Sequence, residues 1–101
     1  MLNTTKEIEN GILVVTLEGS LDTLSSPGFD KELEELLPTV SGLTLDFEKL
    51  EYISSAGLRT LLAAQQYMED NNHPNVKVLN INETIRETFE LTGFDEMLDI
   101  E

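Results

Sequence analysis

Two neighbouring serines precede a small residue and a glycine in the segment Ser54-Ser55-Ala56-Gly57, at the start of a predicted helix. A helix N-terminus exposes unpaired N–H groups and about half a positive charge. A phosphate attached to a hydroxyl there is therefore stabilised. Gly57 has no side chain, so another backbone or a phosphate can come close to the first turn. Serine is also a leading N-cap residue, so the pattern fits simple capping as well as regulation by phosphorylation.

A carboxylate, Asp22, ends the segment Leu17-Glu18-Gly19-Ser20-Leu21-Asp22, which follows an apolar run. Functional sites in parallel α/β sheets lie at the carboxyl ends of the strands. If the strand before Asp22 runs parallel to the strand before Ser54, Asp22 and Ser55 lie at one edge of the sheet. The other interpretation is that Asp22 is an ordinary turn residue, and the pattern does not decide between them.

Strands are predicted from runs of β-branched and apolar residues. Residues 12–17 read as a strand largely buried on both faces, and residues 4–8 pair with it through the turn Asn10-Gly11. Residues 43–47 form the next strand, which leads into a loop over residues 48–53.

The first helix has its N-cap at Ser26, its first helical residue at Pro27 and its end at Pro38. Its apolar stripe consists of Phe29, Leu33, Leu36 and Leu37. A second helix begins near Ser54 or Ser55.

The C-terminal third predicts a strand over residues 76–79, then a helix capped by Asn82 and ended by a left-handed Gly93. Ile85 and Phe89 mark the buried side of that helix, and Phe94 is placed to touch Phe89. Residues 97–100 form a short last strand. The order β-β-α-β-α-β-α-β indicates an α/β fold with a mixed sheet of four to five strands and three to four helices.

Length and composition limit what such a fold can do. The 101 residues suit one domain, and the net charge of −14 opposes nucleic-acid and anionic-lipid binding. We therefore expect partners with a positive patch, no direct nucleic-acid contact and no membrane insertion. No signal peptide or apolar run of about 20 residues is present, so we expect a cytoplasmic protein.

The residues of the chain give little support to catalysis or to metal binding. The chain has no cysteine, and its one histidine, His73, lies in a polar turn. There is neither a Gly-rich phosphate loop with lysine nor a Ser-His-Asp arrangement. We expect no enzyme activity, no metal and no cofactor, and rank an enzyme acting on nucleotides last.

The chain resembles the family of anti-sigma factor antagonists, whose fold is named the STAS domain. Three segments carry the resemblance: residues 17–22, residues 45–58 with Ser54-Ser55-Ala56-Gly57, and residues 82–94. The middle segment is fairly specific to the family, and the likeness covers nearly all of residues 1–101 in order and spacing.

The resemblance implies a partner-switching phosphoprotein that regulates transcription in bacterial signalling. In that family the unphosphorylated domain binds an anti-sigma factor that is also a serine kinase, which frees a sigma factor. The kinase phosphorylates a serine at the start of the second helix, which ends binding, and a phosphatase restores it. Ser55 takes the acceptor position, and Asp22 matches an acidic residue that lies near the acceptor.

Ser54 departs from the family pattern, because an acidic residue is usual at that position. Ser54 is thus a rival acceptor, and phosphorylation could be weaker or depend on another kinase. A second function therefore stays open, that of a STAS scaffold or subunit of a transporter or signalling complex in which Ser55 is never phosphorylated.

The contact surface is predicted from the second helix and the strand edge. Besides the segment 54–57 and Asp22, it includes the outer face of that helix: Arg59, Ala63, Gln66 and Tyr67. Tyr67 is the expected anchor, because tyrosine and arginine are enriched among interface hot spots. Plain solvent exposure is the alternative for Ala63 and Gln66.

Overall fold

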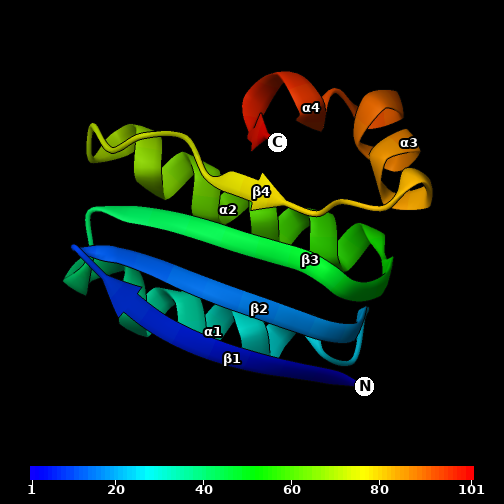
Figure 1. Ribbon diagram of the computed structural model, residues 1–101, viewed down its shortest axis with the longest axis horizontal. Coiled ribbons are helices and arrows are strands. Elements are labelled where there is room, and N and C mark those ends of the chain that lie inside the picture. The colour runs from blue at the N-terminus through cyan, green and yellow to red at the C-terminus, as the bar shows by residue number, and fades with distance from the viewer.

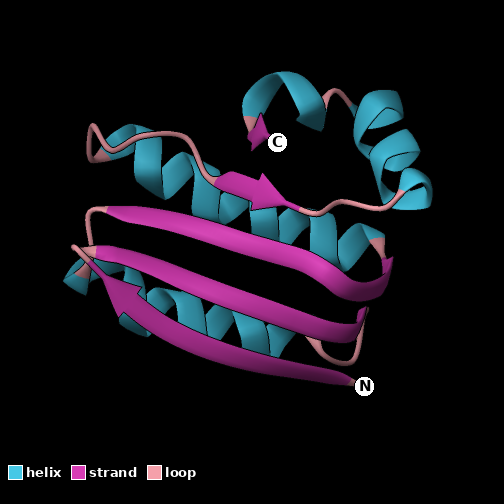
Figure 2. Cartoon of the chain, in the orientation of Figure 1, coloured by secondary structure: helices cyan, strands magenta, loops and turns pink.

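The computed structural model describes residues 1–101, and its elements alternate much as predicted (Figure 2). They follow in the order β1 (Leu2–Glu9), β2 (Ile12–Leu21), α1 (Ser26–Leu36), the 3-10 turn η1 (Leu37–Thr39), β3 (Gly42–Ile53), α2 (Ser55–Asp70), β4 (Lys77–Leu79), α3 (Glu83–Thr92), α4 (Phe94–Met97) and β5 (Asp99–Ile100). The five strands form one sheet in the order β1-β2-β3-β4-β5. The β1 strand is antiparallel to β2, and all other neighbours are parallel. The predicted mixed α/β fold is confirmed.

The N-terminal hairpin turns at Asn10-Gly11, as predicted. Both residues have positive φ, 52° at Asn10 and 81° at Gly11. Two such residues make the turn whose twist matches that of the flanking strands. Glu9 pairs directly with Ile12, so the loop has two residues. This turn fixes the register of the whole β1–β2 pair.

Helices cover one face of the sheet. Figure 1 shows α1 and α2 side by side behind β2 and β3, with α3 and α4 beside the β4 edge. Along β2 the buried residues are Leu13, Val15 and Leu17, whereas Val14 and Thr16 are half-buried. The prediction that β2 is buried on both faces is therefore wrong, because no helix packs on the second face.

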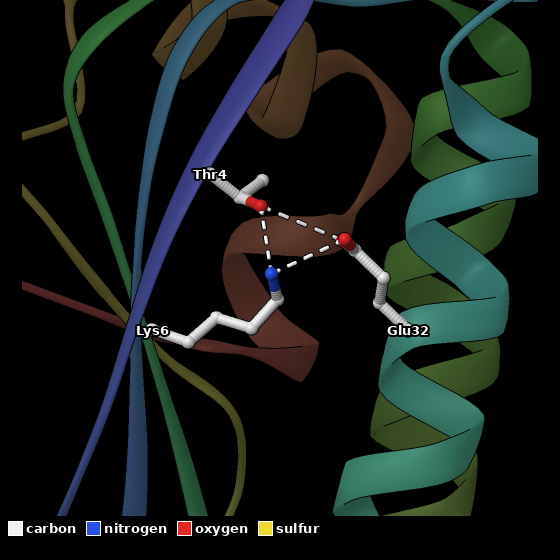
Figure 3. Close-up of polar contacts among 3 residues, drawn as sticks. All are labelled: Thr4, Lys6 and Glu32. Carbon is white, nitrogen blue, oxygen red and sulfur yellow. Dashed lines mark hydrogen bonds and ion pairs between the residues drawn. The ribbon is translucent and has the colours of Figure 1, made fainter.

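A polar cluster ties the edge strand to α1 (Figure 3). The Lys6 Nζ lies 3.2 Å from Glu32 Oε1 and donates to Thr4 Oγ1 at 3.0 Å. The Thr4 hydroxyl donates to Glu32 Oε2 at 3.5 Å. Because these side chains point from β1 toward the helix, they hold the hairpin against the helical layer.

The predicted loop over residues 48–53 is wrong, since β3 continues to Ile53. Leu50 and Ile53 are buried, but the register with β2 shifts twice, between Thr16 and Glu18 and between Gly19 and Ser20. Such irregularities break the two-residue alternation that identifies a strand in sequence. Because that alternation is lost, the charged residues between the buried ones resemble a loop when only the sequence is considered.

The first helix begins one residue earlier than predicted. Its N-cap is Ser25, and Ser26 is already helical and buried. The Ser26 hydroxyl donates to the Asp22 carbonyl at 2.5 Å instead of capping the helix. Pro27 is tolerated in this first turn because no intrahelical donor is needed there.

The C-terminal predictions are largely confirmed. Asn82 Oδ1 accepts from the Ile85 N–H at 2.8 Å, and Gly93 has φ 80°. The Phe89 ring lies 5.8 Å from that of Phe94. The short α4 was not predicted, and β4 and β5 are shorter than expected. None of the helices has an apolar stretch long enough to cross a bilayer.

Candidate partner-binding site

The site forms where β2 and β3 end together. Leu21 and Ile53, the last residues of the two parallel strands, are register partners. Just beyond them the Ser54 N–H donates to the Leu21 carbonyl at 2.9 Å. The two loops that follow, toward α1 and toward α2, therefore begin side by side, and Asp22 and Ser55 lie at the same edge of the sheet.

Ser54 is the N-cap of α2. Its φ and ψ are −96° and 175°, and its Oγ accepts from the Gly57 N–H at 3.2 Å. The Ser54 carbonyl accepts from the Leu58 N–H at 2.9 Å. An aspartate can accept the same bond, so the serine at this usually acidic position keeps the capping role.

Ser55 is the first residue of α2, and its side chain is exposed. The first N–H groups of a helix have no partner within it. Since Ser54 takes the Gly57 N–H, the N–H groups of Ser55 and Ala56 remain at the tip of this 16-residue helix. This is the electropositive end of the helix dipole.

Gly57 is buried where the helix meets β2. A Cβ at Gly57 would lie 2.7 Å from the Leu21 carbonyl oxygen and 2.8 Å from Ile53 Cγ1. A glycine in a helix costs roughly 1 kcal/mol relative to alanine, and this close approach explains why it is present. The sequence allows either another backbone or a phosphate to approach Gly57, and in the structure the neighbour is the Leu21 backbone. Gly57 therefore positions the helix and is not itself a contact residue.

Asp22 organises the loop between β2 and α1. Its Oδ1 accepts from the N–H groups of Leu24 and Ser25, both at 3.0 Å, and from the Ser25 hydroxyl at 3.1 Å. The Ser25 backbone N–H is the main reason why the pKa of Asp22 lies below its usual value, with further help from the Ser25 hydroxyl and the Leu24 N–H. Asp22 is thus an ionised, half-buried turn residue at the site edge.

The outer face of α2 is exposed at Arg59, Ala63 and Gln66. Tyr67 differs, because it is half-buried and packs against the hydrophobic core. Tyr67 therefore exposes only part of its ring to a partner, and its contact area is smaller than that of a fully exposed tyrosine. Ala56 is also half-buried.

Two residues at this edge were not anticipated from sequence. Ser25 holds the loop together. Its single hydroxyl proton is shared between the Ser20 carbonyl, at 2.9 Å, and Asp22 Oδ1, and its oxygen accepts from the Asp22 N–H at 2.9 Å. Leu24 is 92% exposed at the tip of the same loop. The pair Asp22 and Ser25, three residues apart, is a turn signature that could have indicated the first of these.

Comparison with known proteins gives a consistent family. The model of the family described as "STAS domain" matches residues 3–101. A protein of Bordetella bronchiseptica named as an anti-sigma factor antagonist, BtrV, is 31% identical over 87 residues, which cover 84% of this chain and 73% of BtrV.

Solved structures agree on the fold. An anti-sigma factor antagonist from Mycobacterium paratuberculosis superposes with a TM-score of 0.86 at 22% identity, covering 99% of this chain and 85% of the other. The unphosphorylated anti-sigma factor antagonist SpoIIAA gives 0.79 at 19% identity, covering 98% and 87%. The phosphorylated form of SpoIIAA from Bacillus gives 0.79 at 20% identity, covering 98% and 91%.

Proposed function

Because this chain belongs to the STAS domain family, and within it to the anti-sigma factor antagonists, we propose that it is a phosphorylation-controlled binding protein. In the unphosphorylated state it binds an anti-sigma factor that is also a serine kinase, in the cytoplasm, and so frees a sigma factor. Phosphate on Ser55 ends this interaction, and a serine phosphatase reverses the modification. The protein acts by binding and not by catalysis.

The observation that carries the proposal is the exposed Ser55 at the tip of α2. The Ser55 Oγ attacks the γ-phosphorus of ATP in the kinase, ADP leaves, and the hydroxyl proton passes to a base of the kinase. Ser54 is the weaker acceptor, because it is half-buried and its Oγ already holds the Gly57 N–H.

Phosphorylation acts on this surface by charge. It adds about −1.5 to −2 charges to a chain whose net charge is −14. Inside an interface shaped for a hydroxyl, the phosphate would lose its water without gaining a cation from the partner. A penalty of about 2.7 kcal/mol weakens binding about 100-fold.

No refolding is needed for such a switch. A phosphate at Ser55 would meet the positive end of α2 and lie one turn before Arg59, the only basic residue of that helix. The phosphorylated and unphosphorylated forms of SpoIIAA match this fold equally well, with a TM-score of 0.79 for each. This agreement supports a switch that acts at the interface, with the fold unchanged.

The test uses the purified serine kinase of the anti-sigma type encoded in the same genome, titrated calorimetrically with the wild type, Ser55→Ala and Ser55→Asp. We expect Ser55→Ala to bind like the wild type and Ser55→Asp to lose about 100-fold in affinity. With ATP, phosphopeptide mapping should find phosphate on Ser55.

The matched controls are Ser41→Ala and Ser41→Asp, because Ser41 is also exposed but lies before β3, at the opposite edge of the sheet. Both controls should bind like the wild type. Equal affinity of Ser55→Asp and the wild type would contradict the switch and favour the scaffold function, in which Ser55 stays unmodified.

A further inference from the structure

A groove of about 250 Å³ lies between α1 and α2, the two helices that run side by side in Figure 1. Its floor is the outer wall of the core, formed by the buried side chains of Leu33, Leu37 and Ala64. The α2 side of the groove is made by Ala63 and Tyr67. Because residue 63 is an alanine, the two helices leave space between their exposed faces.

The size of the groove limits what it can hold. Pockets for small-molecule ligands usually measure about 300–1,000 Å³, which is larger than this groove. A cavity of roughly 150 Å³ already accommodates a benzene ring. At about 250 Å³ the groove suits one large apolar side chain.

The rim of the groove is acidic. Asp30 and Glu34 line it from α1, one helical turn apart. Neither takes part in the two ion pairs of the chain, which are Lys6–Glu32 and Lys77–Glu101. Like charges at this spacing repel each other, so a Lys or Arg from a partner would relieve the repulsion.

The groove continues the surface that carries Ser55. Ala63 and Tyr67 follow Ser55 by eight and twelve residues along α2, which is roughly 12 and 18 Å at the rise of an α-helix. Both distances exceed the Debye length of about 8 Å at physiological salt. A partner that lies along α2 can thus contact both Ser55 and the groove. The charge of a phosphate on Ser55 has little electrostatic effect at the groove.

We infer that this groove receives one large apolar side chain of the anti-sigma factor, flanked in that partner by Lys or Arg. The inference rests on the proposed function and extends it, because it adds a second contact that does not depend on phosphorylation. The contacts at Ser55 and in the groove should therefore contribute independently to the affinity.

Calorimetric titration with the same purified kinase tests the groove through Ala63→Leu, which fills it from an exposed position. We expect about tenfold weaker binding, by the same factor in the wild type and in Ser55→Asp. Thr84→Leu, which adds the same side chain at an exposed position of α3, should bind like the wild type. Equal melting temperatures of the variants show that the fold is kept.

The rim is tested with the double variant Asp30→Asn and Glu34→Gln, which should bind about threefold more weakly and with less dependence on salt. The control, Glu87→Gln with Glu90→Gln, removes the same charge from α3 and should bind normally.

Unchanged binding of Ala63→Leu, with Ser55→Asp still impaired, would overturn the groove alone. A wild type that does not bind the kinase would overturn the proposed function and the groove with it.

Discussion

The two edges of the sheet are anchored in different ways. At the carboxyl edge, the loop after β2 depends on the ionised, half-buried Asp22, which accepts from Leu24 and Ser25. At the amino edge, the loop before β4 depends on the neutral Gln65, which is 0% exposed. Gln65 Oε1 accepts from the Val76 N–H at 2.8 Å. One edge is held by a charge at the surface and the other by an amide inside the core.

The proposed site does not coincide with the larger groove. The groove at the amino edge is larger, about 720 Å³, and is lined by polar residues such as His73 and Asn75. However, α2 ends beside it at Asp70, and the C-terminal end of a helix disfavours a phosphate. The carboxyl edge has the helix start, the exposed serine and the surface-anchored loop together.

The largest expected effect is that of Gly57→Ala at the carboxyl edge. The new Cβ would meet the Leu21 carbonyl oxygen at 2.7 Å, so either α2 or β2 must shift. We expect a loss of about 3 kcal/mol in the free energy of unfolding, measured by urea denaturation, and weaker partner binding.

Gly28→Ala is the matched control, because a Cβ there has no neighbour within 4 Å. It should stabilise α1 by roughly 0.5–1 kcal/mol. If both variants changed stability alike, the close packing of α2 on β2 would not be what requires Gly57.

The amino edge should respond to Gln65→Met, which keeps the side-chain volume but removes the amide. The Val76 N–H would lose its acceptor, at a cost of about 1–3 kcal/mol for a buried donor. Urea denaturation measures the loss, and the affinity for the kinase should remain that of the wild type. A drop in affinity at full folding would show that the two edges are coupled.

The elements specified by neighbouring residues were predictable from sequence. Asn10-Gly11 sets its turn, and Asn82 and Gly93 bound α3, because each acts on backbone groups a few residues away. A shared edge for Asp22 and Ser55 could be predicted on the condition that their strands are parallel, and the parallel pairing of β2 with β3 meets that condition.

The features that depend on distant atoms were not predictable. The sequence shows a glycine inside a helix, which lowers the stability of the helix. The reason for this glycine is the nearby Leu21 carbonyl, which only the β2–β3 pairing brings there. The strand over residues 48–53 was missed because register shifts hide its alternation. Tyr67 looked like a free surface residue, since its spacing gives no sign that α1 lies beside it.

A smaller effect is expected from Ser54, the cap at the carboxyl edge. Ser54→Ala leaves the Gly57 N–H without its acceptor and should cost about 1 kcal/mol in thermal or urea unfolding. Ser54→Asp should unfold like the wild type within a few tenths of a kcal/mol.

The same pair separates capping from kinase recognition. If the usual carboxylate also recruits the kinase, Ser54→Asp should speed the phosphorylation of Ser55 while stability stays constant. An equal rate in the wild type and Ser54→Asp would assign the position to capping alone.

The smallest effect, and the one that distinguishes the two anchors most directly, is the response to acid. The N–H and hydroxyl donors bind the ionised Asp22 and lower its pKa below the usual 3.8. Its contribution to stability is therefore complete above that usual value and is lost as the pH falls through the lower pKa of the folded state. Gln65 has no proton to gain.

In an NMR titration from about pH 5 to 2, the amide signals of Leu24 and Ser25 should move below pH 3.8, while that of Val76 stays in place until the chain unfolds. In Asp22→Asn this movement should disappear. If the Val76 signal moved together with those of Leu24 and Ser25, the two edges would respond to acid as one unit. The proposed partner-binding edge would then not open independently when Asp22 is protonated.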